Sequence, residues 1–206
     1  MMTDERGKLI VVTGCDGSGK STIMNLIKKH NPNTIALKTP LPPYDNFREI
    51  FTGEDERNTH KTFRYFQKAL ESDLKIINNI LNNGKDIIIE RYIETTWAFH
   101  LTNCLLNNKD PNHEMLNTSI QKPDLTIVLV ADIEERMNRI NTRDKKDWWE
   151  TRDFQLLYQH NLINTSKELS KYVKYINTGS NSIEDTREII TRNINYLNIG
   201  KQHCRE

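Results

Sequence analysis

Short uninterrupted apolar runs alternate along this chain with longer stretches in which apolar residues recur every three or four positions. The runs have the length of strands, and we expect strands at residues 8–13, 86–89, 125–130 and 173–176, with a further strand possible at 34–38. Runs without polar interruption are typical of strands that are buried on both faces of a parallel sheet.

The stretches between the runs have the spacing of amphipathic helices. We expect helices at residues 21–29, 63–81, 133–140, 154–169 and 183–197. Local signals mark some of the helix ends. Asn83 and Gly84 stop the second helix, Asp132 is placed to cap the third, and Ser182 with Asp185 marks the start of the last.

The alternation of strands and helices predicts βαβ crossovers and therefore an α/β fold with three layers. We expect a parallel sheet of about five strands with helices on both faces. Because no internal repeat or linker divides the sequence, residues 1–206 are expected to form a single domain. A highly charged stretch between two expected helices predicts a short lid over approximately residues 139–153.

Composition narrows the function classes. The formal net charge is +1 over 206 residues, so a global basic field for binding nucleic acid is missing, although local basic clusters leave such a partner open. The three cysteines are far apart and form no CxxC pair, which argues against a disulfide framework and a structural zinc site. The polar N-terminus and the lack of a long apolar run lead us to expect a cytoplasmic protein.

The stretch VVTGCDGSGKST joins the first expected strand to the first expected helix. Gly14, Gly19, Lys20 and Ser21 fit the pattern G-x-x-x-x-G-K-[ST] in the strand-to-helix context that it requires. Glycines let backbone N–H groups turn inward, and the lysine reaches the terminal phosphates. We therefore expect ATP with Mg²⁺, the metal lying at Ser21. The expected ATP contacts in this stretch are Gly14, Asp16, Gly17, Ser18, Gly19, Lys20, Ser21 and Thr22.

Glu90 and Arg91 directly follow an apolar strand of three isoleucines. Ligands of open α/β sheets bind beyond the carboxyl ends of strands, so both side chains should face the same crevice as Lys20. Glu90 is expected to orient a Mg²⁺-bound water or to accept a hydrogen bond, and Arg91 to hold the acceptor and donor phosphates. The alternative is a surface ion pair of little energetic weight.

GCDGSGKST together with ERYIETTWAFH resembles the thymidylate kinase family of P-loop nucleoside monophosphate kinases. That family has a second motif, D-R-Y-x-x-S-x-x-A-Y-Q. The matches are Arg91, Tyr92 and Ala98, and the replacements are Glu90, Thr95, Phe99 and His100. The similarity continues through KPDLTIVLVADIEERMNRI and the helix that follows the lid. One segment, KTPLPPYDNFREIF, lacks the family's usual E-P-G-G-T loop and resembles the mitochondrial-type UMP/CMP kinase instead.

The resemblance implies which residues hold the acceptor nucleotide. Asp16 is expected to contact the acceptor sugar, and Tyr65 or Phe66 to stack on the base. Arg64 or Lys68 would contact the base edge or the phosphate, and the alternative for a helix residue of this kind is a place in the core or in solvent. His100 either contacts the base or is a structural residue. The acceptor candidates are Asp16, Pro40, Arg48, Arg64, Tyr65, Phe66, Lys68, Arg91, Thr95, Phe99 and His100.

Phosphoryl transfer needs positive charge beside the moving group. In the family that arginine comes from the P-loop or from the lid, and residues 15–18 contain none. The lid candidates are Arg139, Arg143 and Arg152, with Arg143 first because it lies within the charged segment and Lys145 and Lys146 in reserve. With Lys20, Glu90 and Arg91, Arg143 completes the expected catalytic set; the alternative is a solvated charge run.

The expected reaction transfers the γ-phosphoryl group of ATP to a pyrimidine monophosphate, most directly dTMP. The adenine is expected between Arg139 and the loop NTGSN, which contains Gly179. Other acceptors stay open, namely dUMP, UMP, CMP, a deoxynucleoside or a modified base in DNA, and so does a nucleotide-binding module without catalysis. The family also implies a homodimer.

Overall fold

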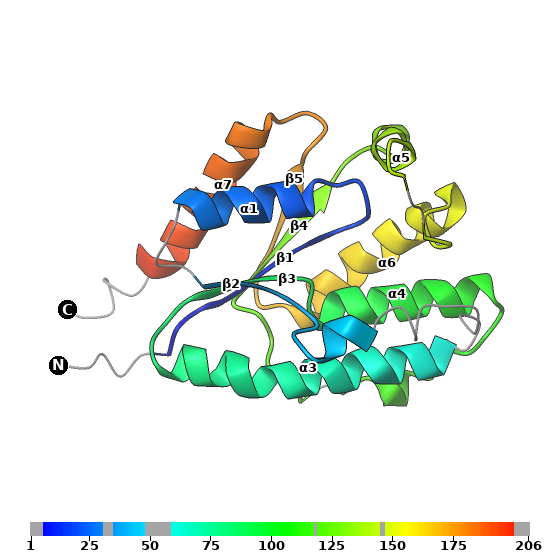
Figure 1. Cartoon of the computed structure of the whole chain (residues 1–206), viewed down its shortest axis with the longest axis horizontal. Coiled ribbons are helices and arrows are strands. Elements are labelled where there is room, and N and C mark those ends of the chain that lie inside the picture. Colours follow the sequence, from blue (N-terminus) through cyan, green and yellow to red (C-terminus); the bar gives the residue numbers. More distant parts are fainter. Residues whose placement is uncertain (1–5, 31–34, 48–58, 118, 145–146, 200–206) are drawn as a thin grey trace.

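The structure is a computed structural model that describes residues 6–30, 35–47, 59–117, 119–144 and 147–199. A parallel sheet of five strands lies between two helical layers, as Figure 1 shows. The strands are β1 (Leu9–Gly14), β2 (Ile35–Lys38), β3 (Ile87–Glu90), β4 (Leu125–Val130) and β5 (Val173–Asn177). Their order is β2-β3-β1-β4-β5, and every neighbouring pair is parallel. The expected α/β fold is confirmed, and so is the further strand that the sequence suggested at residues 34–38.

Helices cover both faces of the sheet. Those of the described residues are α1 (Lys20–His30), α3 (Thr59–Asn82), α4 (Ile93–Leu106), α5 (Ile133–Asn141), α6 (Arg152–Leu169) and α7 (Ile183–Ile199), with short 3₁₀ helices η1 (Tyr44–Phe47) and η2 (His113–Met115). In Figure 1, α1 and α7 lie together on one face, and α3, α4 and α6 lie on the other. Within the described residues, no helix combines the length and the apolar character that crossing a bilayer requires.

The central strand shows why the apolar runs have no polar interruption. Leu9 and Val11 of β1 pack into the core beneath α3 and α4, whereas Ile10 and Val12 pack into the core beneath α1 and α7. Successive side chains of a strand point to opposite faces, and here both faces are covered. The strand is therefore buried at every residue.

Helix α4 was not expected from the sequence. It packs against both α3 and α6, and its buried residues lie on nearly all of its sides. A helix that is buried all round has no polar face, so the usual amphipathic spacing is missing. This helix carries much of the acceptor side of the site described below.

The helix-end predictions were mostly right. At the start of α7 the backbone N–H of Asp185 donates to Ser182 Oγ at 3.1 Å, and the N–H of Ser182 donates to Asp185 Oδ2 at 3.3 Å. This is a reciprocal cap of the kind expected there. Gly84 follows α3 with φ of 73°, a left-handed conformation that ends a helix. The predicted cap at Asp132 was wrong in one respect, because its side chain makes no capping hydrogen bond.

Candidate active site

The candidate site lies where β1 and β3 end side by side. The chain leaves β1 into α1 on one face of the sheet and leaves β3 into α4 on the other, which opens a crevice at the carboxyl ends of the two strands. Arg91, the first residue after β3, has φ of 70°, which is uncommon for a residue other than glycine. Its backbone N–H donates to Val12 O at 3.2 Å, so both strands hold it.

The turn after β1 is a P-loop. Gly17 and Gly19 have φ of 77° and 87°, and a Cβ on Gly17 would lie 2.7 Å from the carbonyl oxygen of Arg136. Only glycine fits such a position without strain. Lys20 is buried at the start of α1, and its ammonium donates to Cys15 O at 2.8 Å. Burial and the nearby Arg91 lower the pKa of Lys20 to about 8.

Asp16 joins the P-loop to Arg91. Its Oδ1 accepts from Arg91 Nη2 at 3.3 Å and lies 4.0 Å from Lys20 Nζ, and its Oδ2 accepts from Gln155 Nε2 at 3.2 Å. Burial works against the charge of this carboxylate, but Lys20 and Arg91 overcome it and hold the pKa of Asp16 at about 2. The carboxylate is therefore ionised at neutral pH, within a compact cluster of compensating charges.

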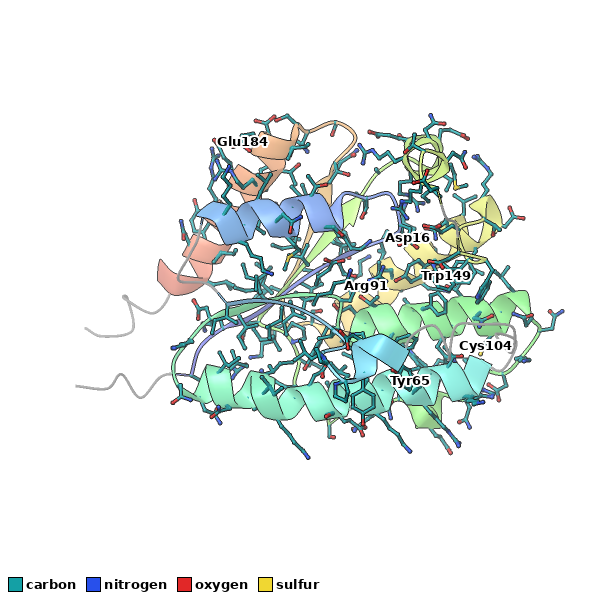
Figure 2. All side chains as sticks on the ribbon, in the orientation of Figure 1. Asp16, Tyr65, Arg91, Cys104, Trp149 and Glu184 are labelled. Carbon is teal, nitrogen blue, oxygen red and sulfur yellow. The ribbon has the colours of Figure 1, made fainter. Side chains whose placement is uncertain are left out.

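A cavity opens on the α4 side of this cluster. Figure 2 shows that Asp16, Arg91 and Trp149 lie close together around its charged end. Seven of the residues that line it were predicted as acceptor contacts, namely Asp16, Pro40, Phe66, Arg91, Thr95, Phe99 and His100. The cavity thus has one charged end and one end lined by aromatic and small polar side chains, which suits a nucleotide that enters with its phosphate toward the P-loop.

A second hollow lies on the other side of β3. Ser21, Lys38 and Glu90 line it, and the buried Glu90 carboxylate lies 3.8 Å from Lys38 Nζ. A hydroxyl and a carboxylate beside a phosphate-binding loop are oxygen donors of the kind that Mg²⁺ prefers. The residue types present here therefore fit a magnesium ion. Thr22, the next residue of α1, is exposed.

Arg139 connects the P-loop to the loop after β5. Its Nη1 donates to Gly17 O at 3.0 Å, and its Nη2 donates to Thr178 O at 3.2 Å and pairs with Glu135. Gly179 follows Thr178, and a Cβ there would collide with the carboxylate of Glu135. The two segments expected to flank adenine are thus bound to each other through one guanidinium.

The sequence profile of the thymidylate kinase family matches residues 12–190. The chain belongs to the thymidylate kinase family. It is 28% identical over 197 residues to the probable thymidylate kinase of Methanocaldococcus jannaschii, an alignment that covers 91% of this chain and 94% of that protein. The predicted family resemblance is confirmed, whereas the resemblance of the acceptor region to UMP/CMP kinases finds no support.

Solved structures agree with the family assignment in their fold. The thymidylate kinase of Candida albicans superimposes with a TM-score of 0.75 at 22% identity and covers 95% of this chain and 94% of its own. The deoxyadenosine kinase of M. mycoides, solved with bound dATP, superimposes with a TM-score of 0.71 at 20% identity, covering 91% and 99%. The fold is therefore shared with a kinase that is named for a nucleoside acceptor. Because the fold does not identify the acceptor, the acceptor has to be inferred from the residues of the site.

Two lid arginines of this thymidylate kinase family member have different surroundings. Arg143 pairs with the buried carboxylate of Glu150, and its charge is among those that lower the pKa of Asp16. Arg152 pairs with Glu134, and both of these side chains are largely exposed. Of these two arginines, Arg143 is therefore the one whose charge acts on the P-loop carboxylate of Asp16, and its catalytic role stays a prediction. Lys145 and Lys146 lie outside the described residues.

Three predicted acceptor residues do not line the cavity. Arg64 and Lys68 are exposed on α3, and the hydroxyl of Tyr65 donates to Tyr44 O of η1. Figure 2 places Tyr65 on the side of α3 next to η1, away from Asp16. Because a helix presents only one face to a cavity, Phe66 turns inward and its neighbours do not. Arg48 lies outside the described residues.

Sequence reasoning missed a buried pair that supports Asp16. Arg136 is fully buried in α5, and its Nη1 donates to Gln155 Oε1 at 3.0 Å. The same Oε1 accepts from the Asp16 backbone N–H at 3.2 Å. A signal existed, because Arg136 shares the helix face of Ile133 and Ile140 and should therefore point inward.

The second group that was missed belongs to the cavity itself. Asn103 and Thr96 line it from α4. Tyr158 lines it from α6, and Trp149 lines it from the turn before α6. Asn103 comes four residues after Phe99, so the helical spacing would have found it once α4 was recognised. The residues from α6 carry no such signal, since only the packing of α6 on α4 brings them there.

Proposed function

We propose that this protein transfers the γ-phosphoryl group of ATP to dTMP and forms dTDP and ADP. The observation that carries the proposal is the place of Arg91. Its guanidinium pairs with the P-loop carboxylate of Asp16, and both residues line the acceptor cavity, in a member of the thymidylate kinase family. An arginine at this point can hold a phosphate bidentately next to Lys20.

The reaction needs no covalent enzyme intermediate. A phosphate oxygen of dTMP forms a bond to the γ-phosphorus while the bond from that phosphorus to the β,γ-bridging oxygen breaks, and the charge passes to ADP. The P-loop and Lys20 hold the donor phosphates, and Arg91 holds the acceptor phosphate. Asp16 supports this arrangement because it keeps Arg91 and Lys20 in fixed places and lies where a sugar hydroxyl can donate to it.

Mg²⁺ belongs to the proposal as the partner of ATP. Ser21 and Glu90 would hold it, either directly or through water, at the hollow beside β3. When bound, Mg²⁺ neutralises part of the phosphate charge and orients the phosphates. Arg143 of the lid is proposed to add the remaining positive charge, since its effect already reaches Asp16.

The aromatic end of the cavity supports a pyrimidine base. Phe66, Phe99 and Leu70 provide apolar surface that would accommodate the 5-methyl group of thymine, and Asn103 provides an amide for the polar edge of the ring. His100 replaces the amide that most of the family has at this position. The homodimer and the cytoplasmic location expected from the sequence stay predictions.

The test is phosphoryl transfer from γ-labelled ATP to a panel of acceptors: dTMP, dUMP, UMP, CMP, thymidine and single-stranded DNA. We expect label in dTDP at the highest kcat/KM. Transfer of the label to added thymidine, but not to added dTMP, would replace the proposal with a nucleoside kinase. ATP binding without transfer to any acceptor would indicate a binding module. A Lys20→Ala variant, run in parallel, excludes transfer by a contaminating kinase.

A further inference from the structure

A group of metal-ligating side chains lies outside the phosphoryl-transfer machinery, between the start of α3 and the second half of α4. His60, His100 and Cys104 each offer one ligand atom, and these three atoms lie within 4.8 Å of one another. Figure 2 shows Cys104 near the end of α4 that is farther from Arg91. The spacing of the cysteines argued against a structural zinc site. Histidines were not part of that argument, and here two helices bring two histidines next to one cysteine.

The cluster has a regular origin in the helices. His100 and Cys104 are four residues apart on α4, so their side chains leave the same face of the helix. Cys104 Sγ lies 3.8 Å from His100 Nδ1 and 3.7 Å from His100 Nε2. His60 belongs to the first turn of α3, and its ring centroid is 5.4 Å from that of His100. Two helices thus present an N,N,S donor set to one point.

The loop between α4 and η2 fixes the two imidazoles. His60 Nε2 lies 2.9 Å from Asp110 O, and His100 Nε2 lies 2.9 Å from Pro111 O. A carbonyl oxygen can only accept, so in each neutral ring the proton is on Nε2 and the lone pair is on Nδ1. A metal-bound histidine is usually held in this way, with the distal N–H donated to a carbonyl.

We propose that His60, His100 and Cys104 form a binding site for a divalent transition metal ion, of which Zn²⁺ fits best. The ligands are Nδ1 of each histidine and the Cys104 thiolate, a soft donor set that selects Zn²⁺ over Mg²⁺. Binding forms the metal–sulfur bond as the thiol proton passes to solvent, and water fills the fourth position. Ligand atoms around a tetrahedral Zn²⁺ ion lie closer together than 4.8 Å, so binding would draw the three side chains together.

The site has both a protected interior and a route for the ion. Cys104 is fully buried and His100 nearly so, whereas His60 is partly exposed and the adjacent residues Asp110 and Asn112 are exposed. His100 also lines the acceptor cavity. A bound ion would therefore fix the imidazole that borders the acceptor, independently of which acceptor the enzyme uses.

The test is a titration of untagged, chelator-treated protein with Co²⁺, which reports its ligands in absorbance. We expect one ion per chain, the visible bands of four-coordinate cobalt and a near-ultraviolet thiolate-to-cobalt band, and we expect Zn²⁺ to displace the cobalt. Cys104→Ser should remove the thiolate band. His60→Ala should keep the band but weaken binding by at least about tenfold.

Two other histidines serve as matched controls. His113, whose ring lies 5.4 Å from Trp97 in the same region, and His160, exposed on α6, are outside the cluster. His113→Ala and His160→Ala should bind cobalt like the wild type. The proposal is overturned if wild-type protein binds no stoichiometric cobalt, if the band survives Cys104→Ser, or if His60→Ala binds as tightly as the control variants.

Protein stability supplies a second readout that does not depend on phosphoryl transfer. Zn²⁺ should raise the midpoint of thermal unfolding of the wild type and of both controls, because it binds the folded chain. The rise in the unfolding midpoint should be absent in Cys104→Ser and smaller in His60→Ala, which binds the ion more weakly. His60 is only partly buried, so the His60→Ala variant decides the matter if Cys104→Ser does not fold. Equal shifts in His60→Ala and wild type would count against the site.

Discussion

The two ends of the acceptor cavity are built on different principles. At the phosphate end, Asp16, Lys20 and Arg91 lie within 4.0 Å of a partner of opposite charge, and all three come from the segments that directly follow two adjacent strands. At the base end, Phe66, Phe99 and Asn103 come from two helices and meet through packing. Charges fix the first end and helix packing fixes the second, so the phosphate end should govern turnover and the base end should govern affinity.

The largest effect is expected from Arg91→Ala. Removing the guanidinium deprives the transferring group of its fixed positive charge, and kcat should fall on the order of a thousandfold. Initial rates of ADP formation at saturating ATP and dTMP measure this. Arg192→Ala, which removes an exposed arginine paired with Glu188 on α7, should behave like the wild type. A variant that lost only affinity for dTMP would reverse the division between the two ends.

Arg143→Ala should lower kcat on the order of a hundredfold, as the loss of one electrostatic stabiliser does. The effect is smaller than for Arg91 because the side chain is about half exposed and paired with Glu150. Arg152→Ala separates the lid arginines, since its pair with Glu134 is exposed and should contribute little. If single-turnover rates fell with Arg152→Ala and not with Arg143→Ala, Arg152 and not Arg143 would be the lid residue that stabilises the transferring phosphoryl group.

The phosphate end was also the part that the sequence allowed us to predict. Gly14 to Lys20 is one contiguous motif, and Arg91 follows a strand whose burial is evident from its isoleucines. A parallel sheet brings such strand ends to one edge, so proximity follows from topology. Gln155 could not be found in this way, because it reaches Asp16 across 139 residues through the packing of α6.

The base end resisted prediction for a related reason. Helix α4 lies between α3 and α6, which removes the polar face that marks a helix in a sequence. Without that helix, Thr96 and Asn103 had no expected neighbours. His60 and Cys104 likewise come together only because α3 begins beside the second half of α4. Motifs report chemistry that is local in sequence, whereas helix packing makes sites from residues that carry no local signal.

The contrast extends to the buried carboxyl groups. Glu94 lies in the first turn of α4, and both of its carboxylate oxygens are buried without a hydrogen-bond partner. Burial raises the pKa of Glu94 to about 8, whereas Asp16 at the phosphate end has a pKa of about 2. The folded chain therefore keeps a proton on Glu94 that the unfolded chain loses above about pH 4.5.

This protonation predicts a stability difference of defined sign. As pH rises from about 5 to about 8, the wild type should lose about 3–4 kcal/mol of unfolding free energy relative to Glu94→Gln, which cannot ionise. Urea unfolding of both proteins at several pH values measures the difference. Parallel pH profiles would show that the folded chain does not keep Glu94 protonated.

The smallest effect is expected at the base end from Phe66→Ala. Loss of an aromatic surface in the cavity should raise the KM for dTMP about tenfold, while kcat changes less than about threefold, because the ring is remote from the moving phosphoryl group. Tyr65→Phe decides between the two rings that the sequence left open, and its KM should not change, since Tyr65 lies outside the cavity. A fall in kcat as large as that of Arg91→Ala, at unchanged KM, would mean that helix packing at the base end sets the position of the phosphate. The two ends would then act as one unit rather than as separate devices for turnover and affinity.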